Sequence, residues 1–276
     1  STSSTAITQG PARESLLDRM EKEYKASCER RLILEKDYVA RHNLQPFGHP
    51  TEEFYNGNFT SFYDILRISM KDSTSLLKNV FDDFDSLPIA HRVTLFKNFY
   101  SKFWMVELIY KSIKYFKNTT KLFMASLITC IEINTAEQWT GGEVKVVEKE
   151  AFLTSCQGFS KEYYDLFTPM MKMDVMTDRE FYALAVLNYC DVDTLDLPEE
   201  VITITQATRA KVFEELQDYY RNALNLHDFS KRLGNLMTMA HGFGEAGNLM
   251  FEEMRMYATM FDVYSDDLLF REWLSQ

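Results

Sequence analysis

The sequence has little glycine and proline, and its cysteines are few and scattered. The 276 residues include 10 glycines and 6 prolines, and so few breakers over a long chain favour helices over a sandwich of many strands. The four cysteines form no CxxC pair, which excludes a zinc finger within these residues. Their scatter indicates reduced, buried thiols in an intracellular protein.

The chain also lacks an excess of positive charge and any long apolar run. Its formal net charge is −11, and so acidic a surface repels a polyanion. No apolar run approaches the ~20 residues that a membrane span needs. We therefore expect these residues neither to bind DNA by themselves nor to enter a membrane.

Motifs that would mark an enzyme are missing as well. There is no glycine-rich phosphate loop, no GxSxG elbow and no HExxH zinc motif, and the five histidines show no i, i+4 pairing. The run DDFD at 82–85 resembles the DDxxD motif of all-helical terpene synthases, but Ser86 stands at its fifth position. Asp191 and Asp193 begin like a calcium loop, but Leu195 replaces an oxygen ligand. We predict no enzyme, and no metal or cofactor in these residues.

Large apolar side chains are abundant and recur at helical spacing. Hydrophobic residues make up 46% and aromatic residues 14% of the chain, with 14 methionines. This composition suits either a bulky core or a pocket of irregular shape. An amphipathic helix that begins near Ser15 is predicted by apolar side chains at every fourth position, namely Leu16, Met20, Tyr24, Cys28 and Leu32.

The pattern after this helix predicts further helices and one short β-ribbon. Residues 37–58 hold two prolines and two glycines and are expected to be loop-like, and the ribbon is expected within 121–148. Thr177 and Glu180 form a capping box. Helices are predicted up to about Asp85, over 90–117, from about 160, after the capping box, and over 199–225, 228–261 and 266–274.

Two of these helices carry unusual features. The helix over 228–261 contains four glycines, each costing about 1 kcal/mol against alanine, so that packing must compensate or the helix must kink. The last helix has the pattern φφxEφφ, where φ is apolar, from Leu269 to Leu274. So short a helix is unstable alone, and it must dock on the body or stay loose.

Several segments, in order along the chain, resemble one family. The central segment FDSLPIAHRVTLFKNFYSKFWMVE is similar to the signature of nuclear receptor ligand-binding domains through Phe84, Leu87, Pro88, Val93, Leu95, Phe96 and Lys97. EFYALAVLNYC resembles the family's eighth helix, Arg232-Leu233 with LMTMA its tenth, and LLFREWL its C-terminal activation helix. The resemblance covers roughly residues 14–276. The segments LLDRMEKEYKASCERR and LFKNFYSKFWMVELIY resemble those of the nematode branch related to hepatocyte nuclear factor four.

The resemblance implies the fold and the general function. It implies an all-α, three-layer sandwich of about ten to twelve helices with a small β-ribbon over 14–276, after a disordered linker over 1–13. It also implies a ligand-regulated transcription factor module of the nucleus, with DNA binding and zinc confined to a separate domain outside these residues. A constitutive dimerisation scaffold with a filled pocket and, less favoured, an all-helical lipid enzyme stay open as alternatives.

The resemblance further implies surfaces for partner proteins. Coactivator or corepressor peptides would bind an apolar groove as a short helix of the LxxLL type. Lys97 would bind the carbonyls at the C-terminal end of that peptide, and Glu272 would accept from the amides at its other end. Val80, Val93 and Phe96 would floor the groove, with Leu269 and Trp273 closing it or facing the core. A homodimer or heterodimer would form through Arg232, Leu233 and Leu236.

A lipophilic ligand would lie among the helix over 62–81, the middle of 99–113, the β-ribbon and the helix ending near Phe261. Its expected lining is Leu77, Phe81, Trp104, Leu108, Met124, Met256 and Met260. Lys111 stands where several relatives keep an arginine that holds a fatty-acid carboxylate, and it would either keep that role with weaker selection or reach solvent. His91 and Arg92 replace the usual Asp-Gln pair of the signature, so the polar contacts there should differ.

Overall fold

Helices dominate the computed structural model, which describes residues 14–49, 51–116, 122–132, 148–171, 176–193, 195–264 and 267–275. The expected linker over 1–13 lies outside these residues. Within them there are eight α-helices, namely α1 (Leu16–His42), α2 (Phe59–Val80), α3 (Ile89–Phe116), α5 (Lys149–Met171), α6 (Asp178–Cys190), α7 (Glu199–Asp218), α8 (Ser230–Met260) and α9 (Leu268–Leu274). The expectation of ten to twelve helices was too high for the described residues, because α3 and α8 run unbroken for 28 and 31 residues.

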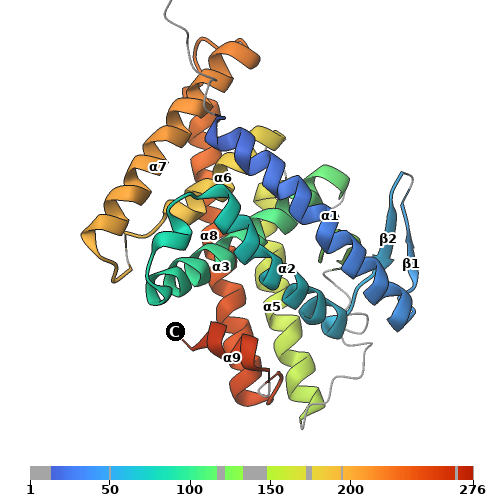
Figure 1. Ribbon diagram of the computed structural model, residues 1–276. Coiled ribbons are helices and arrows are strands. Elements are labelled where there is room, and N and C mark those ends of the chain that lie inside the picture. The colour runs from blue at the N-terminus through green and yellow to red at the C-terminus, as the bar shows by residue number, and fades with distance from the viewer. Residues whose placement is uncertain are drawn as a thin grey trace, which may run out of the picture.

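The helices stack in three layers, as the expected sandwich requires (Figure 1). α1 packs on α2, α3 packs on α6 and α8, α7 packs on α6, and α5 packs on α8. The middle helix α3 is buried around most of its circumference from Leu95 to Phe116. This burial confirms the prediction of a central helix from its apolar residues on all sides.

The N-terminal helix begins where its sequence predicts and ends later than expected. The Ser15 hydroxyl accepts from the amide of Asp18, and the helix continues to His42 before Asn43 adopts a left-handed conformation. Tyr38, in the segment expected to be a loop, is buried and donates to Asp64 at 2.9 Å. Tertiary packing against α2 therefore extends the helix beyond its predicted end.

A small sheet of four strands lies at one end of the sandwich. Its strands are β1 (Pro46–Gly48), β2 (Glu53–Asn56), β3 (Leu122–Met124) and β4 (Thr129–Glu132), in the order β1-β2-β4-β3. The hairpin β3–β4 confirms the predicted ribbon, while the EVKVV segment lies outside the described residues. The prediction of a loop over 37–58 was wrong for β1 and β2, because β2 gains its place by pairing in parallel with the distant β4.

The later helices match their predicted starts to different degrees. Thr177 and Glu180 form the predicted capping box at the start of α6, and α7 continues as a π-helical turn over Tyr219–Ala223. α5 begins at Lys149, about three turns before the expected position near 160. The Asp267 side chain caps α9 by accepting from the amides of Leu269 and Phe270.

Two of the four glycines in α8 are explained by close packing. A β-carbon at Gly247 would lie 2.7 Å from the carbonyl oxygen of Ser101 on α3, and one at Gly242 would lie 2.9 Å from the Met170 sulfur on α5. The helix is continuous from Ser230 to Met260. Packing thus compensates for the glycines, and no kink is needed.

Candidate functional site

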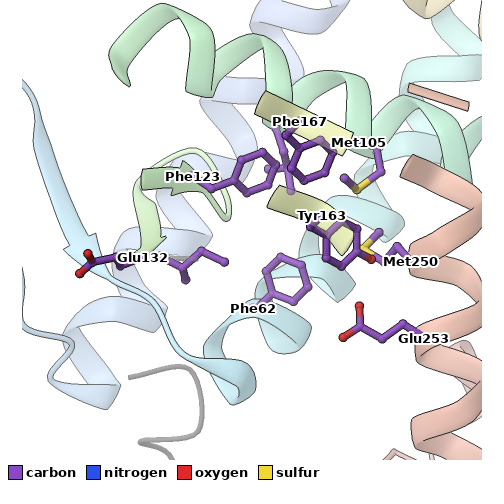
Figure 2. Close-up of a pocket in the computed structure, with 10 residues that line it drawn as sticks. Phe62, Met105, Phe123, Glu132, Tyr163, Phe167, Met250 and Glu253 are labelled. Atoms are coloured by element: carbon purple, nitrogen blue, oxygen red, sulfur yellow. The ribbon is translucent and has the colours of Figure 1, made fainter. Parts of the chain in front are cut away.

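The helices and the sheet enclose an apolar cavity of about 60 Å³ (Figure 2). It lies among α2, α3, α5, α8 and the β3–β4 hairpin, which is where the sequence places a ligand. Its lining consists of Phe62, Met105, Leu108, Phe123, Ile131, Glu132, Tyr163, Phe167, Met250 and Glu253. Ligand pockets usually measure roughly 300–1,000 Å³, so a bound molecule of that size would require side chains to move.

Glu253 is a buried carboxylate at the edge of this cavity. Glu253 is only 6% exposed. Its Oε1 accepts a hydrogen bond from the Tyr257 hydroxyl at 2.6 Å. Burial raises the pKa of Glu253 to about 7, although the hydrogen bond from Tyr257 and the nearby Tyr163 hydroxyl act in the opposite direction. A carboxyl group here is therefore close to half-protonated at neutral pH.

The residues expected to line the ligand pocket lie in several different parts of the structure. Leu108 lines the cavity, and Trp104 packs behind Phe62 with ring centroids 4.9 Å apart. Leu77 and Met124 are buried elsewhere in the core, and Phe81 stacks on a tyrosine of α6. The two remaining methionines lie away from the cavity, with Met256 half-buried against α5 and Met260 72% exposed.

One signal in the sequence marks a lining residue that the prediction missed. Glu253 stands on α8 in line with Met250, Met254 and Tyr257, all of them buried. A carboxylate inside an apolar stripe of a helix calls for a partner or a ligand. The lining residues Tyr163 and Phe167 lie in the helix predicted from about 160, and they were missed because the sequence does not show that α5 packs against α8 beside the cavity.

Lys111 of α3 is directed towards α1 and does not reach the cavity. Its ammonium nitrogen is 6.0 Å from the centre of the Tyr24 ring on α1, and Lys111 is not part of the cavity lining. Nearby, Arg31 binds both carboxylate oxygens of Glu107 at 2.9 and 2.8 Å. Burial would raise the pKa of Glu107, but Arg31, with smaller help from Lys111, holds it below its usual value.

The C-terminal helix α9 is docked on the body by two aromatic side chains. Phe270 and Trp273 are 1% and 3% exposed. The Trp273 ring packs edge-on against Tyr100 of α3 and Phe251 of α8, both at 5.7 Å between centroids. An ion pair of 2.9 Å between Asp267 and Arg67 of α2 fixes the start of the helix.

Lys97 lies at the C-terminal end of α9. Its ammonium group donates to the Ser275 hydroxyl at 3.4 Å, and that hydroxyl donates to the carbonyl of Glu272 at 2.8 Å. The Glu272 side chain is exposed and Leu269 is half-buried. The structure therefore brings together the lysine and the terminal helix that the sequence pairs.

The residues expected to floor a peptide groove lie on two different surfaces. Val93 is 45% exposed and, with Lys97, borders an open groove of about 570 Å³ between α3 and α8. Phe96 is half-buried and stacks on Tyr100. Val80 is fully buried and borders a separate hollow of about 300 Å³ beside α7.

The residues expected at a dimer seam are largely engaged within the chain. Arg232 donates to both carboxylate oxygens of Glu180, at 2.6 and 2.7 Å. Leu236 is buried and Leu233 is half-buried. The outward face of this part of α8 is formed by Lys231, Gly234, Thr238 and His241.

The two acidic runs that resemble metal motifs are held in ion pairs. Asp82 pairs with Arg19, and Asp85 pairs with Lys78 and Arg92, each at 3.2 Å. Arg92, which replaces the glutamine of the usual signature, thus contacts Asp85. Within the described ranges, no three or more His, Cys, Asp or Glu side chains gather where they could hold a metal ion.

The second acidic run is paired in the same way, with Asp191 bound by Lys102 at 2.5 Å and Asp193 by Arg209 at 3.1 Å.

In the part of the chain that the structure describes, none of the helices combines the length and apolar character that crossing a bilayer would require.

Comparisons with known proteins agree on one family. A family model described as the ligand-binding domain of nuclear hormone receptor matches residues 47–259. The chain is 24% identical over 240 residues to the high zinc activated nuclear receptor protein of Caenorhabditis elegans, covering 80% of this chain and 54% of that protein. It is 24% identical over 261 residues to nuclear hormone receptor family member nhr-16 of the same organism, covering 91% and 63%.

A third similar protein is nuclear hormone receptor family member nhr-42 of Caenorhabditis elegans, 30% identical over 119 residues, or 38% of this chain and 33% of that protein. The chain thus spans between 33% and 63% of the length of these three relatives. All three are nematode proteins, in agreement with the predicted nematode branch.

Proposed function

Because this chain belongs to the family of nuclear hormone receptor ligand-binding domains, we propose that it is the ligand-regulated module of a transcription factor. One observation carries the proposal, namely that the apolar cavity and the docked helix α9 share two walls. On α2, Phe62 lines the cavity and its neighbour Tyr63 contacts Phe270 of α9. On α8, Met250 lines the cavity and its neighbour Phe251 contacts Trp273.

This arrangement supports a physical route from ligand to surface. A helix of seven residues is too short to be stable alone, so α9 depends on the walls that it packs against. A ligand that fits the cavity better when those walls are in place shifts α9 toward its docked position. The docked population then sets how much of the peptide-binding surface is formed.

The ligand in this proposal is a lipophilic small molecule. The cavity is lined by aromatic, aliphatic and methionine side chains, and Met105 and Met250 can change conformation to enlarge it. A fatty acid is the finer form of the prediction, with Lys111 as the group that would hold its carboxylate. Lys111 lies beside Tyr24 of α1 and outside the cavity lining, which gives that finer form no support.

The partner at the surface is a coactivator or corepressor peptide of the LxxLL type. Glu272 and the apolar Val93 are exposed, and Lys97, which borders the same groove as Val93, donates to Ser275 at the end of α9. Glu272 is suited to accept from the free amides at one end of a short helix. Lys97 would serve the opposite end of the peptide or, as its contact with Ser275 suggests, hold α9 in place.

In the whole protein, we place this module beside a separate domain that binds DNA through zinc fingers, and we place its action in the nucleus. A homodimer or heterodimer through α8 completes the proposal. Since Arg232 is held by Glu180, the outward face at Lys231, Gly234 and Thr238 is the better supported seam, with Leu233 at its edge.

A second candidate function is a constitutive interaction module of the same fold. The small volume of the cavity, about 60 Å³, favours it, since aromatic side chains would already fill most of the pocket. In that case α9 would stay docked without a ligand. Peptide binding would be unchanged by any molecule added to the cavity.

Titration of a fluorescent LxxLL peptide, followed by anisotropy, tests the surface. We expect Glu272→Ala to weaken binding by about 10-fold, since hydrogen bonds to a charged group are worth roughly 1.5–3 kcal/mol. Arg271→Ala is the matched control, because Arg271 is the exposed neighbour on the same helix. If both variants bind the peptide as tightly as the wild type, the assignment of Glu272 is wrong.

A further inference from the structure

One end of the cavity is polar, and its polar groups come from two different helices. Glu253 of α8 and Tyr163 of α5 both line the cavity. Figure 2 shows the Glu253 carboxylate directed into the cavity beside Phe62 and Tyr163, while the carboxylate of Glu132 points away from it. Glu253 is therefore the acidic group that a molecule inside the cavity would meet.

The Tyr163 hydroxyl adds a second polar atom at this end. It is buried and, among the residues that the structure describes, no atom lies in hydrogen-bonding geometry to it. Buried hydroxyls nearly always have a partner, because leaving one unpaired costs stability. A ligand atom that bonds to Tyr163 would remove that cost, so the hydroxyl points to a polar group on the ligand.

The charge of the lining selects among ligand classes. The described residues that line the cavity include two glutamates and no lysine, arginine or histidine. A carboxylate ligand would meet a like charge at Glu253 without a cation to balance it. A donor group would instead find a buried acceptor, which in the case of an ammonium group is of opposite charge.

We propose that the ligand of this cavity is a lipophilic molecule whose polar end donates hydrogen bonds, an amine above all, and that Glu253 and Tyr163 receive this end. The proposal rests on the ligand-binding function proposed above and names the class of ligand. The apolar part would lie against Phe62, Leu108 and Phe167. Lys111, which is not a lining residue, takes no part.

The state of Glu253 fits this role. The hydrogen bond from Tyr257 holds the carboxyl group in one orientation, so its geometry is set before a ligand arrives. Burial raises the pKa of the group to about 7, and none of the described residues places a cation beside it to stabilise its charge. An ammonium group in the cavity supplies that missing cation, and the carboxylate form becomes the favoured one.

The test compares three probes of equal chain length: octylamine, octanol and octanoate. Their binding to the 276-residue chain is measured by titration calorimetry. We expect the amine to bind about 10-fold or more tightly than octanoate, with the alcohol in between, as charge-assisted hydrogen bonds are the strong ones. Glu253→Gln should abolish the preference for the amine and improve the binding of octanoate.

Two further variants make the test specific. Glu132→Gln removes the other lining carboxylate, which points away from the cavity, and it should leave the order of the three probes unchanged. Tyr163→Phe should weaken the alcohol by a few-fold, since it removes one hydrogen-bonding atom. Equal affinities for octylamine and octanoate, or the same order in Glu253→Gln as in the wild type, would overturn the proposal.

The possible failures are distinguishable. Tight binding of octanoate by the wild-type chain would contradict the proposal that the ligand donates hydrogen bonds, but it would leave the proposed ligand-binding function intact. If no probe binds to the wild type or to any variant, the ligand-binding function itself falls, and this inference falls with it.

Discussion

Two buried glutamates, one on each side of the sandwich, show how its two halves differ. Glu107 of α3 is bound by Arg31 through both oxygens and by the Tyr24 hydroxyl at 2.8 Å. Glu253 of α8 has tyrosines around it and, among the described residues, no cation beside it. The same side chain thus has its pKa lowered on one side and raised to about 7 on the other.

The difference suggests what each half does. Charge-assisted hydrogen bonds require one fixed geometry, so the pairing of Arg31 with Glu107 locks α1 to α3 in a single arrangement. The other half is held by aromatic rings and methionines, which tolerate repacking. We infer that the α1 side is the rigid frame, and that the side with the cavity and α9 is the part that responds.

The largest effect on stability should come from removing the buried ion pair between Arg31 and Glu107. Arg31→Met leaves Glu107 buried without its cation, and we expect a loss of about 3–5 kcal/mol in the free energy of unfolding. Urea denaturation measures this loss. The double variant with Glu107→Leu should recover part of it, since Glu107 is then no longer left charged, while the buried Glu35, 3.9 Å from Arg31 in the wild type, still loses its cation.

An exposed pair provides the control for this experiment. Arg41 and Asp37 pair on the same helix α1 with both side chains largely exposed, so Arg41→Ala should have no measurable effect on stability. If Arg31→Met is equally harmless, the two halves do not differ as described.

A smaller effect should appear in the pH dependence of stability. The folded-state pKa of Glu253 lies above its ordinary value of 4.5. The folded chain therefore binds the proton more tightly, and the stability contributed by the neutral form is lost as the pH rises from about 4.5 to about 7. Glu107 behaves in the opposite way, because its contribution is lost as the pH falls through its lowered pKa.

Glu253→Gln isolates the contribution of Glu253. Glutamine does not titrate, so the variant should gain roughly 2–3 kcal/mol relative to the wild type between about pH 5 and about pH 8. Urea denaturation at the two pH values measures the difference. A constant difference between the two proteins would mean that Glu253 titrates like an exposed carboxylate.

Local signals in the sequence predicted the helices well. The caps at Ser15 and at Thr177 with Glu180 mark helix starts that the structure confirms. Strands β1 and β2 could not be predicted in this way, because β2 is fixed by the pairing of Tyr55 with the distant Thr129. A three-residue strand has too little pattern of its own.

The walls of the cavity were harder to predict than the helices that carry them. Leu77 and Leu108 are both apolar residues of long helices, and only tertiary packing separates the buried core residue from the lining residue. Arg232 has the position of an interface residue, but Glu180 binds it within the chain. Glu253 was the one lining residue with a distinctive signal, a charge within an apolar stripe.

The most direct test of the account asks whether the cavity wall supports α9. Phe62 lines the cavity and packs against Tyr63, which contacts Phe270 of α9. Phe116 is buried to a similar extent in a separate cluster beside the sheet, so Phe116→Leu is a matched control for Phe62→Leu. Hydrogen exchange of the amides in 267–275 reports the opening of α9.

We predict that Phe62→Leu speeds exchange in these amides by roughly 10-fold more than Phe116→Leu does, a coupling of ordinary size between two sites. Equal exchange of the α9 amides in the two variants would contradict the claim that the cavity wall holds the terminal helix in place.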